Sequence, residues 1–167
     1  MKWTLINIAR RTVVILFMAT LSLCLAAMGH AQGPACSVVL TAGKWGYSTS
    51  GTVVGIGPRS SLGIFTLDAA GNLMNGRATA SLNGSVMDEF FSETYTVNTD
   101  CTGKLAITVV DSSGNKLFNG TFALVFDDNG REMRAMYTSV TLPDGTALGT
   151  VINVDAKRLF PESSNQQ

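Results

Sequence analysis

Histidine is nearly absent from the sequence. His30 is the only histidine among 167 residues, and it lies in an N-terminal segment that we expect to be removed. Without imidazole, a mature chain cannot form a Ser-His-Asp or Cys-His catalytic group, nor a typical zinc or copper site. The sequence therefore excludes most familiar hydrolase and metalloenzyme mechanisms, and we predict neither a metal nor a cofactor.

Positive charge is also scarce. Residues 1–31 contain Lys2, Arg10 and Arg11, so their removal leaves 9 of the 12 basic residues against all 12 acidic ones, a net charge of −3. Binding to a phosphate backbone needs clustered lysine and arginine side chains. Nucleic acid is therefore not an expected partner.

A sustained helical pattern is missing as well. No stretch after residue 31 repeats its apolar residues with a helical period over about ten residues. Turn-forming sequences recur instead, and they supply the Asp, Asn and Gly residues that tight reversals need. These turns are expected at 55–60, 68–72, 83–85, 98–103, 111–115, 127–130 and 143–146.

The seven turns separate eight runs that are rich in Val, Ile, Thr, Phe and Tyr. Several runs alternate: Leu105, Ile107 and Val109 lie on one face, and Ala106 and Thr108 on the other. Open sheet edges favour aggregation, and the connections are uniformly short. We therefore predict an all-β fold, an eight-stranded antiparallel up-and-down barrel.

The first residues predict export. Three cations precede an apolar run from Val13 to Met28, and small residues follow at 29 and 31. This order is the pattern of a secretory signal peptide, here of bacterial type. We expect cleavage after Ala31 and a secreted or periplasmic protein without stable membrane insertion. The mature chain would hold one barrel domain over 36–160 and a disordered tail over 161–167.

Two cysteines, Cys36 and Cys101, remain after the expected cleavage. Exported chains meet an oxidising compartment in which such residues pair. We predict a disulfide between them. A crosslink that encloses about 65 residues stabilises a fold by on the order of 4 kcal/mol in the loop-closure model.

Gly43 and Trp45 begin the first predicted strand, and Lys157 and Arg158 lie in the last one. A Gly-x-Trp, a hairpin series and a final basic residue together resemble the calycin group of small barrels, such as lipocalins and avidin-like proteins. The rhythm of the turns is more closely similar to a group of uncharacterised exported bacterial proteins with an allene oxide cyclase-like barrel. The calycin resemblance implies that Trp45 closes one end of the barrel and that Arg158 packs over its ring.

Polar side chains on an apolar strand face are candidates for a ligand site inside a small barrel. In the segment FFSETYTVN, residues 90–98, Phe91, Glu93 and Tyr95 share a face. A carboxylate in apolar surroundings is a frequent site residue, although Glu93 at the rim, or paired with an arginine, is the alternative. Tyr95 and Tyr137 can offer a hydroxyl to a ligand, or to the backbone as core residues. We predict Phe91, Glu93, Tyr95 and Tyr137 as ligand-binding residues.

Three functions are compatible with these features. The first is a binding protein for a small apolar or amphipathic molecule. The second is a cofactor-free isomerase or cyclase of the allene oxide cyclase-like type, with Glu93 and Tyr95 as its catalytic residues. The third is a structural envelope protein with a packed barrel. We expect a binding protein rather than an enzyme, and the oligomeric state stays open.

Overall fold

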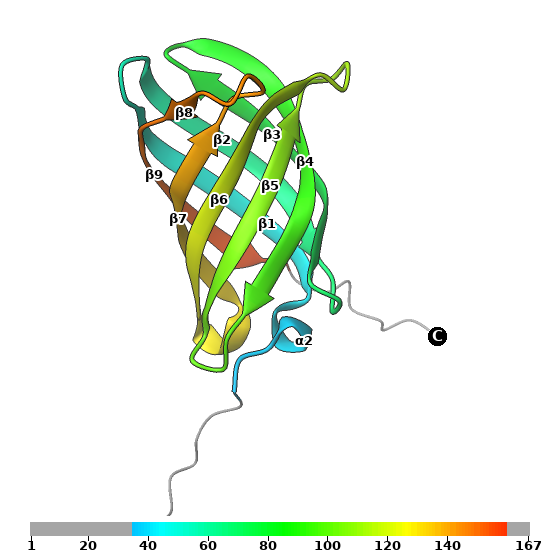
Figure 1. Ribbon diagram of the computed structural model, residues 1–167. Helices are drawn as coiled ribbons and strands as arrows, with labels where there is room; N and C mark the ends of the chain where they lie inside the picture. The colour runs from blue at the N-terminus through cyan, green and yellow to red at the C-terminus, as the bar shows by residue number, and fades with distance from the viewer. Residues whose placement is uncertain (1–34, 160–167) are drawn as a thin grey trace, which may run out of the picture. The chain divides into compact units, whose positions relative to one another are not determined.

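Hairpin-connected strands account for most of the chain that the computed structural model describes, residues 35–159 (Figure 1). The predicted signal peptide at 1–31 and the predicted tail at 161–167 lie outside the described residues. Among residues 35–159, no helix is both long enough and apolar enough to cross a membrane.

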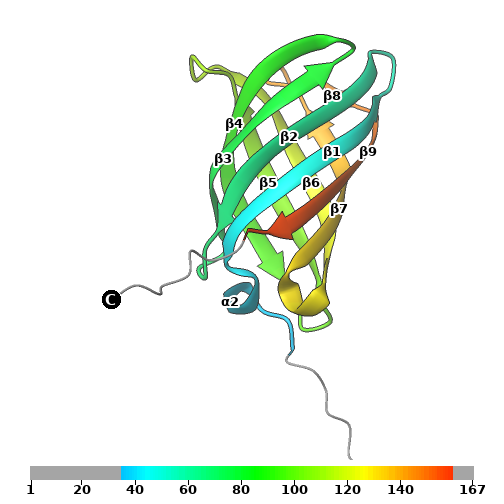
Figure 2. The same cartoon turned by 180° about the vertical axis from the view of Figure 1, so that it is seen from behind.

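The elements follow one another through short connections. In chain order they are α2 (Val38–Thr41), β1 (Gly43–Val53), β2 (Gly57–Leu67), β3 (Asn72–Leu82), β4 (Ser85–Val97), β5 (Thr102–Val110), β6 (Lys116–Asp127), the 3-10 turn η1 (Asp128–Gly130), β7 (Glu132–Thr141), β8 (Ala147–Leu148) and β9 (Thr150–Arg158). Strands β1 to β7 each pair antiparallel with the next. Strand β9 pairs with both β7 and β1, which closes the ring (Figure 2). The predicted eight-stranded antiparallel barrel is confirmed, with the short β8 paired to β7 as an addition.

Alternation along each strand divides an apolar interior from a polar exterior. Leu105, Ile107 and Val109 of β5 are buried, and the residues between them face outward. The same pattern in β6 buries Phe122 and Leu124. Because successive side chains of a strand point to opposite faces, this alternation fixes which residues fill the barrel.

Aspartate side chains shape two of the hairpins. The Asp68 carboxylate accepts hydrogen bonds from the backbone N–H groups of Ala70 at 2.9 Å and Asn72 at 2.8 Å. Asp111 repeats this arrangement in the turn between β5 and β6. Such local bonds stabilise a reversal without any tertiary contact, which is why the sequence reveals these turns.

The first loop is shorter than the predicted range of 55–60. Strand β1 continues to Val53 and β2 begins at Gly57, so only residues 54–56 form the turn. Arg59 therefore belongs to β2, where it pairs with Leu82 of β3. This correction matters because it moves a charged side chain from a loop into the barrel wall.

Several glycines lie where neighbouring strands approach closely, among them Gly51 and Gly63. A Cβ atom at Gly63 would overlap the carbonyl oxygen of Arg77, and one at Gly51 would overlap that of Val151. A glycine inside a strand often marks such an approach and lets the sheet bend strongly. The tight curvature of this small barrel depends on these positions.

The short helix α2 lies at one end of the barrel, the lower end in Figure 1, which we call the closed end. Trp45 is fully buried there, with 0% of its surface exposed. Its ring stacks on Phe65 at 6.4 Å and packs against Phe126 at 5.7 Å between centroids. The indole Nε1 donates a hydrogen bond to the carbonyl of Thr41 at 3.1 Å. Trp45 thus fills the barrel end and holds α2 across it.

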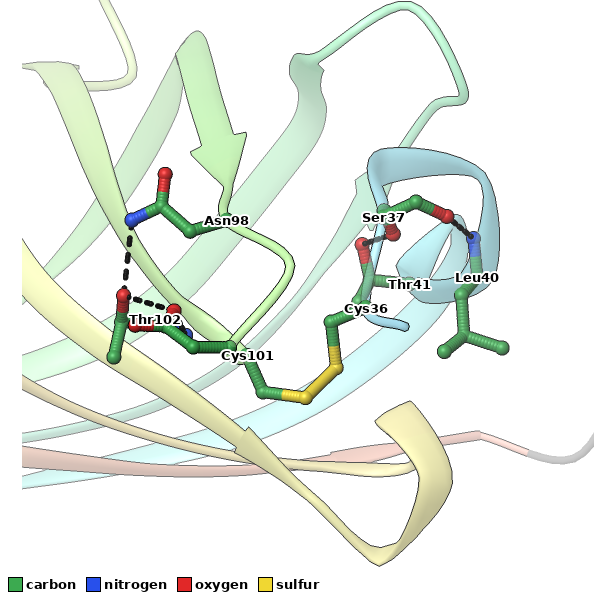
Figure 3. Close-up of a disulfide and its surroundings, with 8 residues drawn as sticks. Cys36, Ser37, Leu40, Thr41, Asn98, Cys101 and Thr102 are labelled. Atoms are coloured by element: carbon green, nitrogen blue, oxygen red, sulfur yellow. Dashed lines mark hydrogen bonds between the residues drawn. A yellow bond between two sulfur atoms is a disulfide. The ribbon is translucent and has the colours of Figure 1, made fainter. Parts of the chain in front are cut away.

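A disulfide fastens the closed end (Figure 3). Cys36 precedes Ser37, the N-cap of α2, and Cys101 lies in the turn between β4 and β5, 65 residues away in sequence. The Ser37 hydroxyl accepts a hydrogen bond from the Leu40 N–H at 3.2 Å, which caps the start of the helix. The predicted disulfide is confirmed, and it is compatible with an exported protein.

Arg158 also holds the closing segment. It lies opposite Trp45 in the pairing of β1 with β9. Its Nη2 donates to the carbonyl oxygen of Leu40 at 2.9 Å and to that of Ala42. Within residues 35–159, Arg158 makes no cation–π contact with the Trp45 indole, although the calycin resemblance implies one. The guanidinium binds backbone carbonyls at the end of α2 instead.

Candidate functional site

An ion pair lies inside the barrel, among otherwise apolar walls. Arg59 of β2 and Glu89 of β4 both fall on inward-facing positions, and they are 7% and 3% exposed. The Arg59 Nη2 donates to both carboxylate oxygens of Glu89, at 2.8 Å and 2.6 Å. Strand β3 lies between β2 and β4 in the sheet, so the two side chains meet over its inner face. The small residue Ala80 of β3 pairs with Ser61 of β2 and with Met87 of β4 at this level.

The pair favours the charged form of Arg59 in a buried environment. Burial by itself lowers the pKa of Arg59, but the hydrogen-bonded carboxylate of Glu89 outweighs it and raises the pKa above its ordinary value. A buried charge is costly unless it is paired and hydrogen-bonded. Arg59 and Glu89 therefore depend on each other for their place in the interior.

A cavity lies between this ion pair and the end of the barrel opposite α2, the upper end in Figure 1. We call this cavity the cup, and its volume is about 220 Å³. Its walls come from the ends of strands and from the adjoining turns, and they are almost entirely apolar. The apolar lining residues are Val53, Ile56, Leu82, Met87, Leu117, Phe118, Val140, Leu142, Leu148 and Ile152.

Apart from Thr150, which begins β9, the polar side chains that line the cup lie at its base. Besides Arg59 and Glu89, the base includes Tyr137 of β7. Burial raises the pKa of the Tyr137 phenol to about 12, so this group stays protonated and able to donate at any ordinary pH. The guanidinium carbon of Arg59 lies 5.4 Å from the centroid of the Phe118 ring, which covers one face of the cation.

The interior below the ion pair is filled. The hydroxyls of Thr49 and Ser61 form a hydrogen bond of 2.8 Å there, and the rings of Tyr47 and Phe65 lie 5.6 Å apart. The remaining space is about 30 Å³, roughly the volume share of one water molecule. A ligand that enters the cup can therefore reach the ion pair and no deeper.

A larger depression, about 1010 Å³, lies on the outer wall of the barrel. Outward-facing residues of six strands line it, among them Leu62, Phe90 and the charged Arg77. It is broad and open to solvent along its length, so a small molecule there would keep most of its surface in water. The cup encloses a ligand far better, which is what small-molecule sites require.

The expectation that Glu93 faces the barrel interior is wrong. Its side chain is exposed, and its Oε1 accepts a hydrogen bond from the Thr108 hydroxyl on the outer wall at 2.9 Å. The pairing of β3 with β4 shifts by one residue between Leu73 and Gly76, next to Glu93. Such a bulge re-aims side chains, so strict alternation fails at this point.

The other predicted ligand residues lie at different levels of the barrel. Tyr137 borders the cup. Phe91 lies below the ion pair, where its ring meets Tyr47 edge-on at 5.8 Å. Tyr95 lies at the closed end, and its hydroxyl donates to the carbonyl of Asp68 at 2.6 Å. The structure therefore brings only one of the four predicted residues, Tyr137, to the cup.

Sequence reasoning missed the ion pair, although the signal was present. Met87, Glu89 and Phe91 alternate with residues 86, 88 and 90, so the argument that singled out Glu93 applies equally to Glu89. Arg59 was assigned to a loop because Pro58 and Gly57 precede it. Pairing an inward carboxylate with an inward arginine on a nearby strand would have found the site.

These features define a class: a closed antiparallel barrel that is sealed at one end and carries an apolar cup over a buried ion pair at the other. No protein-family model and no curated protein sequence matches the chain. One solved structure, that of a redesigned β-barrel, aligns with a TM-score of 0.45 at 17% identity, over 78% of this chain and 100% of that chain. The resemblance to calycins and allene oxide cyclase-like barrels stays a prediction.

Proposed function

We propose that this protein binds a small apolar or amphipathic molecule in the cup. The observation that carries the proposal is the make-up of the cup, with apolar walls around about 220 Å³ and a few polar groups at the base. Ligand sites typically combine a mostly apolar lining with a small number of polar groups that orient the ligand. The cup lies below the usual range of about 300–1,000 Å³, which favours a small ligand.

Burial of apolar ligand surface supplies the affinity. Each 100 Å² of surface removed from water contributes about 2.5 kcal/mol. Most of the lining residues belong to paired strands that are already ordered, so little conformational entropy is lost when a ligand enters. The cup therefore needs no large rearrangement to bind.

The test is binding of Nile red, an uncharged apolar dye, to the purified protein. Met87 lines the cup, and its neighbour Val86 points to solvent with 69% of its surface exposed. We expect Met87→Trp to fill the cup and weaken binding at least about tenfold, which is about 1.4 kcal/mol. The matched variant Val86→Trp is expected to bind as the parent does. No binding by the parent protein would favour the structural alternative, a packed envelope barrel.

One observation favours a second function. A carboxylate, Glu89, and a phenol, Tyr137, both border the cup. A cofactor-free isomerase or cyclase, the activity implied by the allene oxide cyclase resemblance, needs a confining cavity and one such group. Its test is conversion of a reactive epoxide, followed by chromatography with and without the protein. Glu89→Gln should abolish conversion and keep Nile red binding, and identical product mixtures with and without the protein would contradict this function.

A further inference from the structure

The charges at the base of the cup select the polar end of the ligand. Building on the proposed binding function, we infer that the occupant is an uncharged molecule with one carbonyl-type acceptor oxygen, such as a ketone, ester or lactone. Arg59 and Tyr137 bind this oxygen at the base of the cup. The apolar remainder of the molecule extends along the walls of the cup toward the end of the barrel opposite α2.

Arg59 has donors to spare. Both of its hydrogen bonds to Glu89 come from Nη2. Its Nε and Nη1 have no acceptor within residues 35–159, although a guanidinium carries five N–H donors. Arg59 also borders the cup. A ligand oxygen at the base would therefore receive charge-assisted hydrogen bonds from groups that the protein leaves unpaired.

Tyr137 supplies a second donor. The Arg59 guanidinium interacts with its hydroxyl oxygen, the hydroxyl donates to no acceptor within residues 35–159, and the side chain borders the cup together with Arg59. The Phe118 ring covers one face of the guanidinium, so the edge of the cation is the part that can meet a ligand. A phenol and a guanidinium edge both donate to an oxygen, and a guanidinium has no acceptor for a ligand N–H.

The net charge of the base decides between neutral and charged ligands. Arg59 and Glu89 are the only charged side chains that line the cup within the described residues, and they neutralise each other. A carboxylate ligand would add a buried negative charge next to Glu89, and an ammonium would add a buried positive charge next to Arg59. Either leaves one charge uncompensated in a largely apolar cavity, which is costly. A neutral acceptor gains the hydrogen bonds without that penalty.

Four probes with the same chain length test this inference by displacement of Nile red: methyl hexyl ketone, octane, octanoate and octylammonium. The ketone should bind at least about tenfold more tightly than octane, because a hydrogen bond to a charged donor contributes roughly that factor. The affinity of the ketone should also exceed that of octanoate and that of octylammonium by at least about tenfold. Equal binding of ketone and octane, or tightest binding of either ion, would overturn the inference while leaving the cup as a binding site.

Variants of the base separate this inference from the proposed function. Tyr137→Phe should weaken binding of the ketone and leave binding of octane unchanged, since only the hydroxyl is lost. The double variant Arg59→Met with Glu89→Leu should still bind octane, and it should reduce the advantage of the ketone over octane to the part that the Tyr137 hydroxyl supplies. If no probe and no Nile red binds the parent protein, then the proposed function itself fails. If the ketone keeps its full advantage in the double variant, the ion pair does not select it.

Discussion

Separating the two halves of the buried ion pair should be far more damaging than removing both. Arg59 is 7% exposed and Glu89 is 3% exposed, so neither charge can be solvated if its partner is lost. We expect Arg59→Met and Glu89→Leu each to lower the free energy of unfolding by about 3–5 kcal/mol. The double variant keeps an apolar interior of similar volume, and we expect it to lie within about 2 kcal/mol of the parent protein.

Urea denaturation of the parent, the two single variants and the double variant gives the coupling energy directly. We expect a coupling of more than about 3 kcal/mol. If a single variant does not fold, Glu89→Gln provides a milder change that keeps an acceptor for Arg59. A double variant whose loss equals the sum of the single losses would refute the reasoning. The exposed pair Lys157–Glu132, 2.8 Å apart on the outer wall, is the control, and its removal should not shift the midpoint.

Four further changes test the rest of the barrel. Trp45→Ala should cost about 3–5 kcal/mol in urea denaturation because it empties the closed end; an unchanged midpoint would contradict its role. Replacing Cys36 and Cys101 by serine should lower stability by about 4 kcal/mol, whereas reductant should have no effect on that variant. Gly63→Ala should lower the melting temperature, with a cost of about 1–3 kcal/mol from overlap with a neighbouring strand. Burial raises the pKa of Tyr137 from 10.0 to about 12, so its contribution to stability is present below about pH 10, and on the order of 3 kcal/mol is lost as the pH rises to about 12. Burial also raises the pKa of Tyr47, so Tyr137→Phe should reduce, and not abolish, the loss measured by urea titrations at the two ends of that range.

The fold was predictable because its determinants are local. Each hairpin needs turn residues at the reversal and alternation on both sides, and the sequence shows both, as in the Asp68 and Asp111 turns. The disulfide was predictable from two cysteines in a chain whose first residues predict export. The length of the first turn was not predictable from the sequence. Gly57 and Pro58 belong to β2, but these residue types are equally typical of a loop. Only pairing with β3 draws that segment into the wall.

The site was harder to predict because it depends on contacts between strands. Whether a carboxylate faces inward is decided by strand phase, and one bulge turns Glu93 outward while Glu89, four residues earlier in the same strand, stays inside. Arg59 and Glu89 are 30 residues apart in sequence, and nothing local links them. Tyr95 is of a residue type that often binds ligands, but its hydroxyl donates a hydrogen bond to the Asp68 carbonyl at the closed end.

The two ends of the barrel are built from different interactions, and this difference bears on where the proposed ligand would enter. At the closed end a disulfide, the Trp45 indole and the Arg158 guanidinium all hold the backbone of one short segment. At the other end the walls of the cup are apolar side chains near strand ends and turns. Local opening costs least where few such links cross an element, so exchange of a ligand is expected at the cup. The ion pair lies between the two ends of the barrel, where paired strands can hold the Arg59 donors in a fixed position for a ligand in the cup.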